Sequence, residues 1–450
     1  MKVFTCIIIS IFISLQMGCS ALKPADSSSI PKNTKEKTDF EQQIKYNVTE
    51  ISNLKTLQDF LNYAEKNNPK LEAMYNDWQA ELQTIPQMTA LPDPMLSYSI
   101  SQKKENTIGI SQNFPWFGKL NLSGKMAFES AKMMEQKYLS EKLELFYNVK
   151  KNYYEYYYLL RAIGIMKENI SLLKDIEKTA LAEYTVSQSE YTDVIKIQIE
   201  IAKLEDQLRS MEEMKGPIKG RLLAELNLKT DVDLKFPEVI EHKEKNLSLD
   251  ELSTTLKENN PLLKEIESEK QKDKYAIALA KKNYYPDVML GLEYMKSFDQ
   301  DTSMSEPEDD SSDKPLTAMV SINLPIHFSK YRAQEKEMVL RYNSAVQSQL
   351  GKENNLISDL KTALFMYKDS NRKIKLYRDV LIPKMKQNIS VAQNSLSTGK
   401  IILMEIIDNQ RMLLEFQDGY ERAVADNFQA LAEIEMIIGK EIKWEDRHEK

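Results

Sequence analysis

Asn68-Pro69 recurs as Asn260-Pro261, and this repetition is the observation on which the fold depends. Further pairs recur in the same order along the chain: Pro92-Asp93 as Pro286-Asp287, Phe114-Pro115 as Leu324-Pro325, and Leu226-Asn227 as Ile438-Gly439. Two copies that keep one order of motifs indicate a single structural unit built twice. The main difference between the copies is a longer loop in the second, between two hydrophobic segments.

The composition is that of a solvated, helix-rich protein, with 29% charged residues and only 12 Gly among 450 residues. A net charge of -7 provides no basic surface for nucleic acid. The only cysteines are Cys6 and Cys19, so the body of the chain has neither a disulfide nor a cysteine-based zinc site.

The N-terminus has the pattern of a targeting segment. Lys2 precedes an apolar run over 3–17, which is too short for a comfortable transmembrane helix. Gly18-Cys19 then resembles the cleavage box of bacterial lipoproteins. We therefore predict a signal peptide over 1–18, lipidation of Cys19 and a polar tether over 19–53. Ordinary signal-peptidase cleavage nearby is the alternative.

Two long segments carry apolar residues at the alternating spacing of a coiled-coil seam. The first runs without proline from residue 118 to about 178, with the seam Phe146, Val149, Tyr153, Tyr156, Leu160 and Ile163. The second covers 189–226, with Val194, Ile197, Ile201, Leu204, Leu208 and Met211. The second copy repeats this plan over about 331–388 and 401–437, where Pro383 predicts a kink or interruption.

Shorter helices are predicted to begin at Pro69 and Pro261, because proline suits the first turn of a helix. The first of them extends to about Thr89, with a kink expected at Pro86. Together with segment 189–226 it is about as long as segment 118–178. Two short helices placed end to end could therefore run alongside one long helix. An isolated antiparallel coiled coil is the alternative.

Four segments between the helices alternate apolar with small or polar residues. Their apolar positions are Leu96, Tyr98, Ile100, Ile108, Ile110, Val288, Leu290, Leu292, Tyr294, Leu316, Ala318, Val320, Ile322 and Leu324. The opposite face has Ser97, Ser99, Ser101, Gly109, Ser111, Met289, Gly291, Glu293, Met295, Thr317, Met319, Ser321 and Asn323. This period predicts strands at about 94–115 and 287–325, and it is typical of a membrane β-barrel.

Four strands cannot close a barrel, and an open strand edge cannot survive in lipid. The chain is therefore predicted to oligomerise, and a symmetric trimer would give twelve strands. A soluble four-stranded sheet with one wet face is the alternative. The longer loop of the second copy is acidic, and we interpret it as a solvated extracellular loop rather than a calcium site.

At this point the chain resembles the TolC family of outer-membrane efflux factors, over about residues 54–440. The resemblance rests on an ordered set of motifs: Asn68-Pro69, Leu91-Pro92-Asp93-Pro94, Ile110-Ser111-Gln112-Asn113-Phe114-Pro115-Trp116-Phe117-Gly118-Lys119, Thr192-Asp193-Val194 with Gln198, and Thr398-Gly399 with Glu405, Ile406 and Gln410. The Phe-Pro-Trp-Phe-Gly-Lys segment is also similar to the heavy-metal efflux branch.

The resemblance implies a mainly α-helical protein with a membrane β-barrel, in which a trimer forms a 12-stranded barrel above a long periplasmic α-helical tunnel. The first repeat would cover 54–240, the second 241–440 and a C-terminal tail 441–450. The implied function is a passive conduit from periplasm to exterior, in the outer membrane. Its implied partners are a periplasmic adaptor, an inner-membrane pump of the resistance-nodulation-division class, and outer-membrane lipid. No cofactor and no enzymatic activity are expected, since no catalytic constellation is visible.

The resemblance also places a periplasmic entrance at two helix turns. The adaptor-docking tips would be Ser187, Gln188, Ser189, Gly399, Lys400 and Ile401, and the gate residues would be Asp193, Glu405, Asp408 and Lys400. In a trimer, Glu405 and Asp408 would form stacked acidic rings that concentrate cations. The family's usual gate Tyr and Arg are replaced here by Leu396 and Ile401, which leaves Lys400 or apolar packing as the expected means of closure. Ordinary solvated helix charges are the alternative interpretation of Glu405 and Asp408.

Two other classes of protein remain as alternatives. A periplasmic coiled-coil adaptor lipoprotein would need glycine-rich segments flanking a single hairpin, which fits poorly with 12 Gly and a duplicated hairpin. A structural coiled-coil lipoprotein would leave the four alternating segments unexplained. The sequence does not specify the substrate: 21 Met hint at soft metals, yet Met133, Met134 and Met412 are explained by helix packing. No Met cluster with convincing ligand geometry is visible in the sequence.

Overall fold

Helices make up most of the fold, and four short strands form one sheet. The computed structural model describes residues 54–100, 105–185, 191–228, 234, 236–237, 239–297, 316–396 and 403–442. All of these belong to one unit, Thr49–Lys450. Its elements are α3 (Leu57–Asn67), α4 (Pro69–Thr89), β1 (Met95–Ile100), β2 (Glu105–Phe114), α5 (Lys119–Thr185), α6 (Tyr191–Glu225), α7 (Leu249–Asn259), α8 (Pro261–Lys282), β3 (Val288–Ser297), β4 (Leu316–Ile322), α9 (Phe328–Leu376), η2 (Tyr377–Leu381), α10 (Ile382–Leu396) and α11 (Leu403–Ile438).

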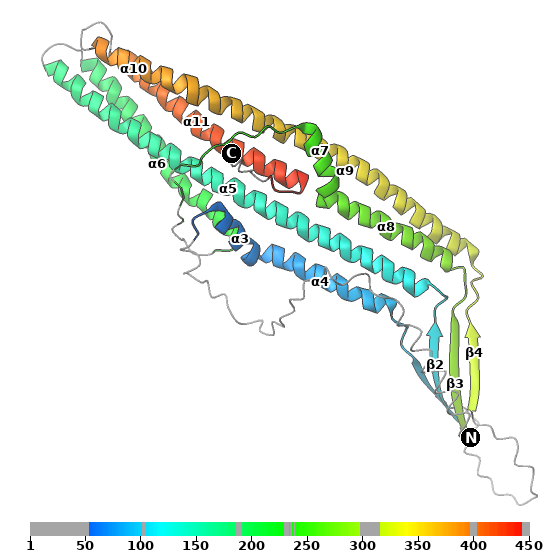
Figure 1. The fold of residues 1–450 in the computed structure, drawn as a ribbon. Helices are drawn as coiled ribbons and strands as arrows, with labels where there is room; N and C mark the ends of the chain where they lie inside the picture. The colour runs from blue at the N-terminus through cyan, green and yellow to red at the C-terminus, as the bar shows by residue number, and fades with distance from the viewer. Residues whose placement is uncertain are drawn as a thin grey trace, which may run out of the picture. The chain divides into compact units, whose positions relative to one another are not determined.

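Helix α5 is the centre of the bundle and contacts α4, α6, α8 and α11 (Figure 1). The predicted seam is confirmed: Val149, Tyr153, Tyr156 and Ile163 are buried on α5. The matching seam of α6 is buried at Val194, Ile197, Ile201 and Leu204. Helix α5 ends at Thr185, beyond the predicted end near residue 178. No described helix, from α3 to α11, combines the length and apolar character needed to cross a membrane.

The two Asn-Pro motifs join helices end to end, as the sequence predicted. The Asn68 side chain accepts hydrogen bonds from the Lys70 and Leu71 amides at the start of α4, while its Nδ2 donates to the Glu225 carbonyl at the end of α6. Asn260 does the same in the second repeat, where Oδ1 accepts from Leu263 and Nδ2 donates to Ile437 at 2.7 Å. One asparagine therefore caps both helix ends at each junction.

The junctions differ in burial, and this leads to a matched prediction. Asn260 is 2% exposed, whereas Asn68 is partly exposed. Asn260→Ala removes a cap and leaves buried helix-end groups unpaired, so we expect a loss of about 2–3 kcal/mol. Asn68→Ala should cost about 1 kcal/mol, because water can replace its bonds. Thermal unfolding of the purified variants checks this order, and a larger loss at Asn68 would contradict it.

The ends of α6 and α11 also correspond, but they differ at one residue. Asn227 and Gly439 both have a positive φ, 54° and 73°. The amides that follow them, of Leu228 and Lys440, donate to Leu223 and Glu435, which closes each helix in a Schellman motif. At Gly439 a Cβ would lie 2.7 Å from the Asn259 carbonyl oxygen. Only glycine fits there, whereas Asn227 has room for a side chain that donates to Asn67.

The predicted interruption near Pro383 is present as a π-helical turn, η2, between α9 and α10. The Ile382 amide donates to the Tyr377 carbonyl, one residue further back than in an α-helix. This wider turn accommodates the proline, which has no amide hydrogen and crowds the preceding turn. Gly419 of α11 provides the space opposite, since a Cβ there would lie 2.8 Å from Tyr377 Cζ. Pro86, by contrast, lies within an uninterrupted α4.

The four strands form one antiparallel sheet in the order β1-β2-β3-β4. Its register places the predicted apolar positions on one face, for example in the row Tyr98, Ile108, Tyr294 and Leu316. The exception is Leu324, which follows the end of β4 at Ile322. These side chains are exposed to solvent within the chain, with Val320 at 70%. The sheet lies at one end of the helical bundle (Figure 1). Among the described residues, β1 and β4 each pair with another strand on one side only.

The segment 239–248, here called the strap, connects the two repeats and crosses the bundle (Figure 1). Tyr157 of α5 accepts a hydrogen bond from the Ile240 amide through its hydroxyl. Tyr367 of α9 accepts one from the Lys245 amide and donates another to the Lys245 carbonyl. Buried tyrosines of both repeats therefore hold the strap by its backbone.

Candidate functional site

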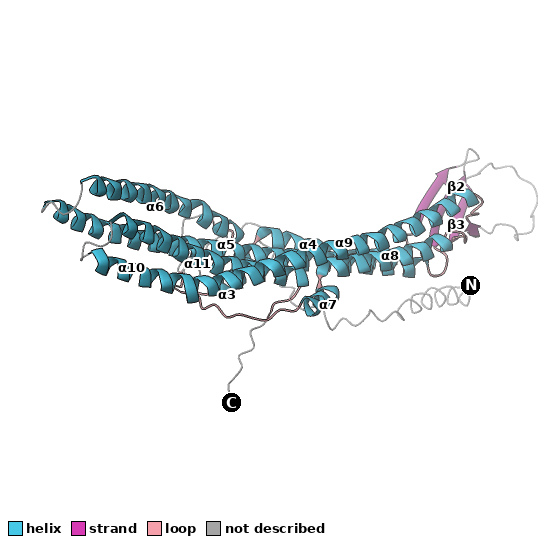
Figure 2. Cartoon of the chain, turned by 90° about the horizontal axis from the view of Figure 1, so that it is seen from above, coloured by secondary structure: helices cyan, strands magenta, loops and turns pink. Residues whose placement is uncertain are grey.

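The candidate entrance lies at the end of the bundle opposite the sheet, where α5 and α10 end and α6 and α11 begin (Figure 2). Of the predicted residues, Asp193, Glu405 and Asp408 are described there. The others are outside the described residues: Cys19, Ser187, Gln188, Ser189, Gly399, Lys400 and Ile401. Their predicted roles therefore stay predictions.

Asp193 and Glu405 occupy equivalent positions in the first turns of α6 and α11. The Asp193 carboxylate pairs with Lys196, one turn along, at 3.1 Å. Acidic residues at this position also suit the positive end of the helix dipole. Glu405 is exposed, as is Asp408 on the next turn of α11. The structure therefore places the two predicted acidic positions of α11 on solvent-accessible surface.

Arg411 is a partner that the sequence analysis missed. Its guanidinium contacts Asp408 at 3.0 Å and Glu200 of α6 at 2.6 Å, so it links α11 to α6. Glu200 is 3% exposed, and its hydrogen bond to Arg411 lowers the pKa of the Glu200 carboxyl. The pKa of Arg411 is raised by the same bond. The available signal was the three-residue spacing from Asp408, but the contact with Glu200 depends on how α6 and α11 pack.

Apolar packing holds the helices together beside this ion pair. Ile407 of α11 joins buried residues of α5 and α6 in one cluster, with Met166, Ile170, Leu173, Ala180, Val194, Ile197, Ile201 and Leu204. In the absence of the usual gate residues, the sequence analysis offered Lys400 or apolar packing as the means of closure. The cluster joins α11 to α5 and α6 within one copy, and the means of closure stays a prediction.

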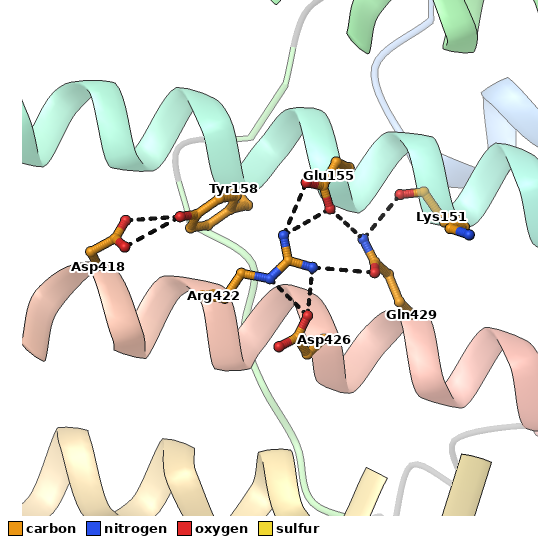
Figure 3. A network of polar contacts seen from close by, with 7 residues as sticks. All are labelled: Lys151, Glu155, Tyr158, Asp418, Arg422, Asp426 and Gln429. Carbon is orange, nitrogen blue, oxygen red and sulfur yellow. Dashed lines mark hydrogen bonds and ion pairs between the residues drawn. The ribbon is translucent and has the colours of Figure 1, made fainter. Parts of the chain in front are cut away.

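A polar network fills the α5–α11 interface in the middle of the bundle (Figure 3). Arg422 donates to both carboxylate oxygens of Glu155 and to Asp426, and its Nη2 also reaches Gln429. Tyr158 donates to Asp418 at 3.0 Å. Burial alone would lower the pKa of Arg422, but the carboxylates of Asp426 and Glu155 raise it. Burial raises the pKa of Asp418.

The strap places the titratable side chain of His242 against α9 and α11. His242 Nε2 lies 2.9 Å from Asn371 Oδ1 and 3.2 Å from Asn427 Oδ1, and both asparagines are buried. Burial lowers the pKa of His242 below its ordinary 6.5, because the charged ring would lose solvation. The hydrogen bonds from Nε2–H to the two asparagine oxygens oppose this shift, but burial has the larger effect, so the site favours the uncharged ring.

This pKa shift predicts a pH dependence of stability. The unfolded chain binds a proton at His242 more readily than the folded chain does, so acid favours unfolding. The contribution of neutral His242 to the free energy of unfolding should be fully present above about pH 6.5. It should decrease as the pH falls below about 6.5 and stop decreasing below the pKa of His242 in the folded chain. Each unit of pKa difference corresponds to about 1.4 kcal/mol. Unfolding temperatures of wild type and His242→Gln between pH 7.5 and 5 test this: an equally steep loss in the variant would assign the effect to other groups.

Among the described side chains, no three His, Cys, Asp or Glu residues gather to hold a metal ion. The end of the bundle at the candidate entrance consists of packed helices, ion pairs and exposed charged side chains. It offers a surface for ions and for other helices.

Comparison with known proteins agrees with this architecture. Residues 252–440 match the family model of the outer membrane efflux protein. Three solved structures have similar folds. The outer-membrane channel OprN has a TM-score of 0.72 and 11% sequence identity, and the match covers 85% of this chain and 89% of that one. CmeC of Campylobacter jejuni has a TM-score of 0.70 and 14% identity, with 85% of each chain covered, and VceC of Vibrio cholerae has a TM-score of 0.69 and 13% identity, with 86% of this chain and 97% of that one covered. No curated protein sequence matches the chain.

The duplicated helical bundle with its four-stranded sheet is thus the fold of outer-membrane channels. Residues 252–440, most of the second repeat, match the outer membrane efflux protein family, and the fold of the described residues resembles that of the solved channels. This confirms the resemblance and the mainly α-helical fold predicted from the sequence. The adaptor alternative gains no support from these comparisons.

Proposed function

We propose that three copies of this chain form a passive duct across the outer membrane, through which an efflux system expels its substrate. The observation that carries this proposal is the exposed apolar face of a sheet with two free edges. Such a face suits lipid, but free edges do not, so the edges must pair with further copies. Three copies supply twelve strands, enough for a closed barrel.

The helical bundle would then continue the duct into the periplasm. A periplasmic adaptor and an inner-membrane pump of the resistance-nodulation-division class are the proposed partners. They would dock at Ser187, Gln188 and Ser189 and at Gly399, Lys400 and Ile401. Lipidation of Cys19 would add an anchor, which fatty-acid labelling of wild type and Cys19→Ala tests.

The entrance would be lined by Asp193, Glu405 and Asp408, with Lys400 nearby. Three copies of each carboxylate around a narrow opening attract cations and repel anions. Arg411 opposes this effect, because it neutralises Asp408 and Glu200. The charge at the entrance is therefore a balance between these groups, and substitutions on the two sides should act in opposite directions.

Single-channel recording in a planar bilayer tests both the duct and its entrance. Wild type should conduct and favour cations in a salt gradient. Glu405→Ala with Asp408→Ala should lower the cation-to-anion permeability ratio severalfold, whereas Arg411→Ala should raise it. Glu415→Ala, an exposed carboxylate further along α11, is the matched control and should change little.

The outcomes separate the two proposals. A purified protein that inserts but never conducts would contradict the duct. If wild type and the three variants all conduct with the same reversal potential, the duct is supported. Glu405 and Asp408 are then ordinary solvated helix charges.

A further inference from the structure

The polar face of the sheet carries one kind of large apolar residue, and that residue is methionine. The register places Met95, Met289, Met295 and Met319 on the face opposite Val320. Their neighbours on this face are Ser, Thr, Gly, Asn and Glu293. Every Leu, Ile, Val, Phe and Tyr of the four described strands lies on the other face, and none of the methionines does.

This separation does not follow from hydrophobicity. Methionine packs in apolar surroundings much as leucine does, and it usually fills irregular gaps in cores. If the four methionines served as apolar residues, they would be shared between the faces or gathered with the aliphatic residues. What methionine has and leucine lacks is a polarisable thioether sulfur. The separation therefore points to a role for the sulfur atoms.

The register brings these side chains close together. Met289 pairs with Ser321 and Glu293 pairs with Thr317, so Met319 is the diagonal neighbour of both. Diagonal neighbours on one face lie about 7–8 Å apart, within reach of long side chains. Met295 follows Glu293 on the same face of β3. Two thioethers and a carboxylate thus share one small area, with a third thioether at its border.

Two glycines on this face leave room for these side chains. A Cβ at Gly291 would lie 3.2 Å from Met319 Cε, so the end of the methionine side chain extends over the glycine. A Cβ at Gly109 would lie 3.0 Å from Glu293 Cγ, which shows that the glutamate extends over its neighbour in the same way. Larger residues at these positions would displace the groups that form the patch.

We propose that this methionine–glutamate patch binds soft monovalent cations of the Cu(I) class as they leave through the duct. The proposal rests on the proposed function, since it names the substrate class of the same conduit. Thioethers prefer soft metals such as Cu(I), while hard cations such as Mg²⁺ and Ca²⁺ prefer oxygen ligands. The Glu293 carboxylate supplies the negative charge that neutral thioethers cannot provide.

A transit site must bind weakly and repeatedly, because an ion held too tightly would not leave. Several exposed thioethers along one face satisfy this condition better than one closed cage. In the proposed ring, β1 of the next copy lies beside β4, so Met95 of that copy would extend the series beyond Met319. Each copy would then contribute methionines to a continuous path around the lumen.

The experiment compares two sets of four methionines in the full-length protein. The sheet variant carries Met95→Leu, Met289→Leu, Met295→Leu and Met319→Leu. The helix variant carries Met88→Leu, Met214→Leu, Met366→Leu and Met412→Leu, which are exposed helix methionines (44–53%) comparable with Met95 and Met295 (59% and 43%). Both sets remove the same number of sulfur atoms and retain the apolar character and approximate volume of each side chain.

Binding of Ag(I), a soft probe that resists oxidation, is measured by equilibrium dialysis of the purified proteins in nitrate buffer. We expect the affinity of the sheet variant to fall at least tenfold and that of the helix variant to match wild type. X-ray absorption of bound Ag(I) should show sulfur neighbours in wild type that the sheet variant lacks. Equal binding by all three proteins, or equal loss in both variants, would overturn the proposal.

Potassium conductance separates this inference from the duct on which it rests. A sheet variant that conducts potassium as wild type does, but has lost Ag(I) binding, supports both. Normal conductance with unchanged Ag(I) binding overturns only the patch. If the fourfold sheet variant does not assemble, Met319→Leu and Glu293→Gln replace it; each should weaken Ag(I) binding several-fold, and two unaffected single variants would overturn the patch.

Discussion

Val320→Asp is expected to remove most of the trimer from the outer membrane. Val320 lies on the apolar face of β4 and is 70% exposed within the chain, so the proposed barrel turns this side chain toward lipid. A basic charge at the bilayer midplane costs about 2–4 kcal/mol and an acidic one somewhat less. Each trimer would contain three such charges. The measurement is the amount of heat-modifiable trimer in outer-membrane fractions.

Ser321→Asp is the matched control, because the neighbouring residue on a strand points to the opposite face. Its carboxylate would face the lumen, where water solvates it, and the trimer should form normally. If Val320→Asp and Ser321→Asp reduce the amount of trimer equally, then the face with Val320 is not the only one that contacts lipid. Normal assembly of both variants would contradict the membrane position of β4.

Gly439→Ala is expected to destabilise the protein by about 3 kcal/mol or more. A left-handed backbone costs an alanine about 1–2 kcal/mol, and overlap in a packed region adds about 1–3 kcal/mol. The overlap cannot be relieved by a side-chain movement, since the nearest atoms are the Asn259 carbonyl and the Asn260 Cα. We therefore expect α11 and α8 to separate at the junction that Asn260 otherwise caps. Thermal unfolding and limited proteolysis near Gly439 report this change.

The first repeat provides the control at its equivalent residue. Asn227→Ala has the same left-handed backbone and loses a hydrogen bond to Asn67, so it should cost about 1–2 kcal/mol. Asn227→Gly relieves the backbone strain and should be milder. If Gly439→Ala were as mild as Asn227→Ala, the close approach of α11 to Asn259 would not persist in solution.

The architecture was predictable because the duplicated motifs lie where helices begin and end. Pro69 and Pro261 mark first helical turns, and their preceding asparagines join the ends of α6 and α11, as the summed helix lengths indicated. The alternating strands were equally clear, since a period of two places each residue on a definite face. The register of the sheet then followed the predicted faces throughout the described strands.

The contacts of the entrance were not predictable to the same extent. Asp193, Glu405 and Asp408 were found from their positions in the chain, but the Arg411–Glu200 pair joins residues that only the packing of α6 and α11 brings together. The same reason concealed the network around Arg422, whose partners lie on α5 and α11. The alternation assigned Met289, Met295 and Met319 to the polar face, but only the strand register placed Met95 with them and showed which side chains are neighbours.

The even number of strands in each copy has a genetic consequence. Because β1 and β4 run in opposite directions, rotation alone can add one copy to the next with every contact antiparallel. Each copy then depends on both neighbours, and one faulty copy leaves a gap that lipid cannot seal. In a cell that makes equal amounts of wild type and Val320→Asp, random mixing leaves about one trimer in eight free of the mutant chain. The mutant allele should therefore be dominant, and efflux should fall far below half.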